Sequence, residues 1–128
     1  LLGLLLRNYE KTCDVPRIRR RKDSENFSIL QYIEQNYQTL TLHELADHFH
    51  YSAQHMSHRL KQITGVSFTE YLLQKRMKIA ADLLTNTSVK VKTIGENAGY
   101  QSQEHFIRTF RKYYGVTPGA YRAMHQKG

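Results

Sequence analysis

The sequence has little of what disulfide-stabilised, zinc-binding or membrane proteins require. It has 128 residues, with a single cysteine, Cys13, and no tryptophan. One cysteine excludes a disulfide framework or a cysteine-based zinc site within the chain. It favours a reducing compartment, so a cytoplasmic location is expected. The apolar run at residues 1–6 is too short to cross a bilayer and lacks the basic flank and cleavage site of a signal peptide. We expect no membrane partner.

Alternation of apolar and polar residues with a period of two is also missing, which argues against strands. Helix signals are present instead. Ser24 is predicted to cap a first helix with an apolar stripe of Phe27, Leu30, Ile33 and Tyr37. A weaker helix is predicted over residues 91–98. Other helices are predicted to begin after these hydroxyl-bearing residues: Thr41, Ser52, Ser67, Ser102 and Thr117. Thr41 and Ser67 are each followed by a glutamate three residues later, the pattern of a capping box. The expected fold class is all-α, with about seven helices.

The charge is uneven. The chain carries a formal net charge of +8, and residues 1–23 supply half of it, with seven Lys or Arg against three Asp or Glu. Residues 17–22 are strongly basic and follow a proline, which is typical of a solvated linker. We expect residues 1–23 to be the end of an absent N-terminal domain plus this linker.

An internal repeat is the most informative pattern. A shift of fifty residues superimposes Ser52 on Ser102 and Gly65 on Gly115, and it preserves an inward stripe that is predicted to include Phe106, Phe110 and Tyr113. Upstream, the shift becomes forty-nine. Each copy is a short helix, a tight turn and a longer helix with a polar outward face, the outline of a helix-turn-helix.

The copies are separated by a predicted helix of about eighteen residues, a rod of roughly 27 Å. Such a rod could hold two reading helices about 34 Å apart, one turn of B-DNA. One chain would then enter two successive major grooves on one side of double-stranded DNA.

Four segments resemble the AraC/XylS-type transcriptional regulators: residues 42–47 (LHELAD), 64–72 (TGVSFTEYL), 76–84 and, most strongly, 99–122 (GYQSQEHFIRTFRKYYGVTPGAYR). The resemblance covers residues 27–122. It implies a DNA-binding domain over residues 24–122, with one subdomain at 24–66, a linker helix at 67–86, a second subdomain at 87–122, and a tail at 123–128. It also implies a bacterial protein that regulates transcription, more often by activation, with RNA polymerase as a possible further partner. The effector and the dimer partner are expected to bind through the absent N-terminal domain.

The resemblance implies that the exposed faces of two helices read bases. These residues are Ala53, Gln54, Ser57, His58, Gln103, Glu104, His105, Ile107 and Arg108. Their chemistry is suitable, because Arg pairs with guanine, Gln with adenine, and Glu accepts from cytosine. The residues predicted to contact phosphates are Ser52, Arg59, Lys61, Ser102, Arg111 and Lys112.

Other functions were weighed against this one. His55 and His58 share a helix face, but no neighbouring cysteine completes a ligand set, so no metal or other cofactor is expected. No arrangement of Ser, His and Asp suggests an enzyme. Two alternatives remain: a helical module that docks on transcription proteins, and a DNA-repair protein that accepts alkyl groups on Cys13.

The predicted helix at 91–98 departs from the pattern. Lys90 occupies its capping position, where a positive charge is unfavourable. Gly95 stands where a small helix former is expected, at a cost of about 1 kcal/mol. We expect this helix to be the softest element of the domain.

Overall fold

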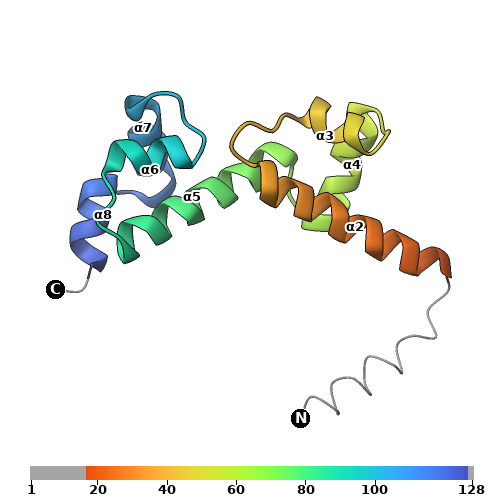
Figure 1. The fold of residues 1–128 in the computed structure, drawn as a ribbon, viewed down its shortest axis with the longest axis horizontal. Coiled ribbons are helices and arrows are strands. Elements are labelled where there is room, and N and C mark those ends of the chain that lie inside the picture. The colour runs from red at the N-terminus through yellow and green to blue at the C-terminus, as the bar shows by residue number, and fades with distance from the viewer. Residues whose placement is uncertain (1–16, 127–128) are drawn as a thin grey trace, which may run out of the picture.

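All regular structure that the computed structural model describes, within residues 17–126, is helical. Its seven helices are α2 (Arg17–Asn36), α3 (Leu42–His48), α4 (Ala53–Thr64), α5 (Phe68–Asn86), α6 (Val91–Asn97), α7 (Gln103–Tyr114) and α8 (Pro118–His125). Figure 1 shows two groups of helices at opposite ends of α5, with α2, α3 and α4 at one end and α6, α7 and α8 at the other. The all-α prediction is confirmed.

The predicted capping residues start the helices where the sequence places them. The side chains of Thr41, Ser52, Ser67, Ser102 and Thr117 each accept a hydrogen bond from the backbone N–H three residues later. At α3 the capping box is complete, because the backbone N–H of Thr41 also donates to Glu44 Oε1 at 2.9 Å. At α5 only the hydroxyl half forms: the backbone N–H of Glu70 donates to Ser67, but its carboxylate does not accept from the Ser67 N–H in return. That box prediction was half right.

The first helix begins earlier than predicted. α2 begins at Arg17, so the backbone of residues 17–22, predicted as a linker, is helical, and Ser24 is not its cap. Among residues 23–36 of α2, the buried side chains are Ile29 and Ile33, spaced four apart, whereas Phe27 is 66% exposed. Of the predicted stripe, Ile33 is buried and Leu30 and Tyr37 pack against the first core, whereas Phe27 lies outside it. The stripe was therefore wrong at Phe27 and missed Ile29.

Two separate cores hold the helices, and α5 belongs to both. The first core packs Ile29, Ile33, Met56 and Leu60 against Leu72 of α5. The second core packs the following buried residues: Met77, Ala80, Leu84, Ile94, Ala98, Tyr100, Phe106 and Phe110. α5 thus contributes side chains to both cores, and each group of helices is too small to bury a large core without it.

The predicted inward stripe of α7 needs one correction. Tyr113 is 40% exposed, and Tyr114 packs against the second core in its place. Tyr114 follows Phe110 by four residues and Phe106 by eight, so it continues the same helical stripe. Its ring lies 4.6 Å from that of Phe110, and burial raises its pKa.

α6 has the capping residue that the sequence predicts, and its glycine makes a contact that the sequence does not predict. Its N-cap, Lys90, makes no side-chain capping hydrogen bond. Gly95, however, is buried where α6 meets α7, and a Cβ at this position would lie 3.0 Å from the ring of Phe106. The glycine therefore allows the close approach of the two helices, a role that the sequence did not predict.

Within residues 17–126, none of the helices is long and apolar enough to span a membrane.

Candidate nucleic-acid interface

The two halves contain the same helix-turn-helix, formed by α3 and α4 in the first unit and by α6 and α7 in the second. In each turn the same backbone bond closes the bend: Tyr51 N–H donates to the carbonyl of Ala46 at 2.8 Å, and Tyr100 N–H donates to that of Gly95 at 2.9 Å. Gly65 and Gly115 end α4 and α7 in the left-handed conformation, with φ of 83° and 85°. The repeat in the sequence is therefore a repeat of backbone geometry.

The outward face of α7 is polar and open to solvent. Gln103, Glu104, His105 and Arg108 are exposed, and Ile107 is half-buried. An open hollow of about 640 Å³ runs along one side of this face, lined by Glu104, Ile107, Arg108, Arg111, Lys112, Gly115 and Thr117. Another of about 530 Å³ lies on the other side, where Arg108 and Lys112 meet the start of α5. α7 therefore stands out as a ridge between two depressions.

The outward face of α4 is smaller and less charged. Gln54 and His58 are exposed, while Ala53 and Ser57 are half-buried. Lys61 is exposed one turn further along. The cations available on this face are fewer than on α7, where Arg108, Arg111 and Lys112 are all exposed. The two faces are thus similar in backbone and different in chemistry, so they suit different base sequences.

Ser52 and Ser102 are exposed at the N-termini of these two helices, but their hydroxyls already accept hydrogen bonds from His55 N–H and His105 N–H. The rings of these two histidines pack near Tyr51 and Tyr100, with centroids 4.7 and 5.2 Å apart. Because both units contain this pair, the contact of His105 with Tyr100 is part of the repeated packing.

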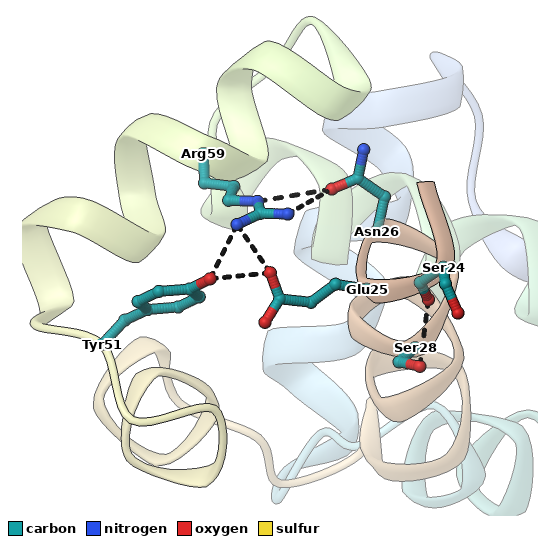
Figure 2. A network of polar contacts seen from close by, with 6 residues as sticks. All are labelled: Ser24, Glu25, Asn26, Ser28, Tyr51 and Arg59. Carbon is teal, nitrogen blue, oxygen red and sulfur yellow. Dashed lines mark hydrogen bonds and ion pairs between the residues drawn. The ribbon is translucent and has the colours of Figure 1, made fainter. Parts of the chain in front are cut away.

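Arg59 lies differently from the other predicted phosphate contacts. Its side chain is 11% exposed and points toward α2 rather than outward (Figure 2). One guanidinium nitrogen lies 2.7 Å from Glu25 Oε1 and from the hydroxyl of Tyr51, and the others donate to Asn26 Oδ1 at 2.9 and 3.3 Å. The guanidinium is therefore committed to holding α4 against α2, and we leave it out of the proposed phosphate contacts.

Tyr51 completes this network. Its hydroxyl donates to Glu25 at 2.7 Å and accepts from Arg59, as Figure 2 shows. The hydrogen bond to the Glu25 carboxylate, together with burial, raises the pKa of Tyr51 above its ordinary value of 10.0, against the opposing effect of Arg59. The network joins α2, the turn of the first unit and α4 through charged hydrogen bonds, which are stronger than neutral ones.

The two helix-turn-helix units lie around different ends of α5. In Figure 1 both helix-turn-helix units lie above α5, with α4 in the group around one end and α7 in the group around the other.

The described residues contain no group of three or more His, Cys, Asp or Glu arranged to hold a metal ion. Cys13 lies outside the described residues.

Comparison with known proteins identifies the family. The profile of a helix-turn-helix domain family matches residues 45–124. The chain is 31% identical to the multiple antibiotic resistance protein MarA of Escherichia coli over 102 residues, covering 79% of this chain and 80% of MarA. The chain belongs to the AraC-type helix-turn-helix family. The relatives include HTH-type transcriptional regulators and the bifunctional transcriptional activator/DNA repair enzyme AdaA of Bacillus subtilis.

Further relatives of this AraC-type domain differ in length. An uncharacterized HTH-type transcriptional regulator of Bacillus subtilis, YtdP, is 38% identical over 96 residues, which cover 74% of this chain and 12% of YtdP. The chain therefore spans a small part of that regulator. Among solved structures, the C-terminal domain of the two-component response regulator yesN of Fusobacterium nucleatum is similar, with a TM-score of 0.74 and 37% identity over 77% of this chain and 98% of that domain.

Some residues that shape this AraC-type interface were not found from the sequence. Glu25 and Asn26 of α2 hold Arg59, and nothing in the sequence marks them as its partners. Arg76 was noted for its family resemblance alone, yet its guanidinium contacts two backbone carbonyls near the end of α2. No sequence signal could have found these carbonyl acceptors, because every residue has one.

Proposed function

We propose that this domain binds double-stranded DNA sequence-specifically, with α4 and α7 in two successive major grooves, and thereby regulates transcription. The observation that carries the proposal is the repeat: two helix-turn-helix units with matching turns, each with an exposed polar face, share one helix as a common wall. A single helix-turn-helix suits many helical bundles, whereas two on one helix suit a bipartite DNA site.

The residues proposed to read bases divide between the units. In the second unit they are Gln103, Glu104, His105, Ile107 and Arg108, and in the first Ala53, Gln54, Ser57 and His58. Arg108 is the strongest candidate, because it is exposed on the ridge of α7 and a guanidinium pairs bidentately with guanine. Lys61, Arg111 and Lys112 are proposed to bind phosphates, with support from the α4 and α7 N-termini at Ser52 and Ser102.

Salt dependence distinguishes DNA binding from protein docking. Three lysine or arginine side chains that neutralise phosphates predict a slope of log K against log salt of about −2.7. A module that docks on another protein predicts a much flatter dependence. A flat dependence would favour that alternative over DNA.

Selection of bound duplexes from a random pool tests the proposal directly. We expect the selected sites to contain two preferred blocks of bases with centres about 10–10.5 base pairs apart. Arg108→Ala should cost about 1–3 kcal/mol and relax one base pair in one block, whereas Lys61→Ala should weaken all sequences alike. A pool that yields no preferred sequence would refute sequence-specific binding.

Activation, as opposed to repression, is proposed on the family resemblance, with RNA polymerase as the candidate contact. We assign no enzymatic reaction to the domain. The alkyl-acceptor alternative is tested by mass spectrometry after incubation with alkylated DNA, where a mass gain on Cys13 would support it. An unchanged mass would exclude it.

A further inference from the structure

A second set of contacts, separate from the continuous backbone of α5, joins the two helix-turn-helix units. The hydroxyl of Tyr37 donates to the backbone carbonyl of Asn97 at 3.0 Å, and Gln38 Nε2 donates to the same oxygen at 2.6 Å. The donors follow the end of α2, which packs in the first core with α3 and α4. The acceptor is the last residue of α6 in the second unit. In Figure 1 the loop after α2 and the loop between α6 and α7 face each other above α5.

Arg76 of α5 lies at the same place. It stands between Leu72, which belongs to the first core, and Met77, which belongs to the second. Its Nη2 donates to the carbonyls of Tyr37 at 3.1 Å and Gln38 at 3.2 Å, and its guanidinium lies 5.5 Å from the ring centroid of Tyr100 in the second unit. One side chain thus touches both units from the helix between them.

Gly99 shows how closely the units approach. Its φ is 101°, and a Cβ at this position would lie 2.6 Å from the carbonyl oxygen of Gln38. The corresponding turn of the first unit has His50 with a φ of 62°, so a left-handed residue in this turn can carry a side chain. Glycine is therefore needed at position 99 because a side chain there would collide with the backbone of Gln38.

We infer that these residues, Tyr37, Gln38, Arg76, Asn97 and Gly99, form a junction that fixes the orientation of α4 relative to α7 and so determines which half-site spacing the domain accepts. The inference rests on the proposed function. A junction of this kind holds the two faces in one arrangement before DNA binds, which lowers the cost of ordering them on a site of matching spacing. Tyr37, Gln38 and Arg76 are therefore positioning residues for spacing specificity.

The junction can be weakened with little change to either core. Tyr37→Phe combined with Gln38→Ala removes both donors to Asn97 while keeping the aromatic ring, and Arg76→Lys keeps the charge while losing the forked geometry. Gln35→Ala is the matched control, because Gln35 is an exposed residue of α2 and takes no part in the junction. Circular dichroism and urea unfolding establish that each variant is folded.

The first test compares binding to a selected duplex with binding to duplexes that have one base pair inserted or deleted between the half-sites. We expect both junction variants to lower the preference for the original spacing about three- to tenfold, as the loss of one or more hydrogen bonds predicts. Gln35→Ala should leave the preference unchanged. A spacing preference equal to that of the wild type in both folded junction variants would overturn the inference.

The second test needs no DNA. Pulsed electron paramagnetic resonance measures the distance between spin labels attached at Gln62→Cys in α4 and Lys92→Cys in α6. Cys13→Ser removes the native thiol. We expect a narrow distance distribution that broadens in the junction variants and not in Gln35→Ala. Equal widths throughout would overturn the inference. If the wild type selects no duplex, the proposed function fails, and the label distances still test the junction.

Discussion

Gly95 and Phe106 form a size-matched pair that the internal repeat allows us to test. The corresponding residues of the first unit are Ala46 and Met56, which are both buried in the first core. The second unit thus has a smaller residue on its first helix and a bulkier one on its second. A Cβ on Gly95 would lie 3.0 Å from two ring atoms of Phe106 and 3.1 Å from its Cβ. These atoms are near the backbone of α7, and the ring is fully buried, so the ring has little room to move away.

The expected magnitude follows from two opposing effects of Gly95→Ala. Alanine favours the helix over glycine by about 1 kcal/mol. Overpacking a well-packed core costs about 1–3 kcal/mol. We therefore expect Gly95→Ala to lower the free energy of unfolding by about 1 kcal/mol, within a range of roughly 0–2. In a Phe106→Met background, which copies the first unit, the overpacking is relieved and the same substitution should stabilise by up to about 1 kcal/mol.

Urea unfolding followed by circular dichroism gives the free energy of unfolding of four proteins: the wild type, each single variant and the double variant. These four values form a double-mutant cycle. The expected coupling free energy is about 1–3 kcal/mol, because the overpacking exists only when the methyl group added by Gly95→Ala meets the phenyl ring of Phe106. The reasoning is refuted if Gly95→Ala stabilises the wild type by about 1 kcal/mol and the two changes add within about 0.5 kcal/mol.

Three further predictions concern single contacts. Lys90→Thr should raise the free energy of unfolding by about 1 kcal/mol, because Lys90 makes no side-chain capping bond while Thr41 caps the equivalent helix; no gain in urea unfolding would refute this. Arg59→Met should lower the free energy of unfolding by about 1–3 kcal/mol and leave the slope of log K against log salt unchanged. Lys61→Ala should make that slope less steep by about 0.9. A less steep slope for Arg59→Met as well would show that Arg59 contacts a phosphate. The pKa of Tyr51 is raised, so the folded protein favours the neutral phenol, and its contribution, complete below pH 10, is lost as the pH rises further. Stability should therefore fall more steeply above about pH 10 in the wild type than in Tyr51→Phe, and parallel pH profiles would contradict this.

Local signals in the sequence predicted most helix boundaries. Capping hydroxyls and the glycines Gly65 and Gly115 act within a few residues, and they leave a recognisable pattern. The repeat added the relation between the two units, because equivalent glycines and serines recur at nearly constant spacing. These signals were sufficient for the all-α fold and for the two helix-turn-helix units.

Tertiary contacts account for what the sequence did not predict. α2 carries apolar residues on adjacent faces, and only its packing decides that Ile29 is buried and Phe27 exposed. Arg59 looked like a free cation on a reading helix, yet a carboxylate on another helix holds it. The sequence indicated only that Gly95 weakens its helix, because the position of the Phe106 ring against it depends on tertiary packing. In each case the deciding partner lies far away in the sequence.

The predicted reading residues remain to be tested on DNA. Of the candidates on α7, only Ile107 is half-buried and the others are exposed, whereas both Ala53 and Ser57 of α4 are half-buried. We therefore expect substitutions on α7 to change base preference more than those on α4. A selection experiment with Arg108→Ala and Gln54→Ala would compare the two faces directly, and a larger loss of preference for Gln54→Ala would reverse this ranking.

Hydroxyl-radical footprinting of the domain on a selected duplex most directly tests whether both units bind one DNA molecule. If α4 and α7 enter successive major grooves, the protected stretches should lie on one side of the duplex with centres about 10–10.5 base pairs apart, and Arg108→Ala should weaken protection in only one of them. A single protected stretch, or two stretches on opposite sides of the duplex, would contradict bipartite binding.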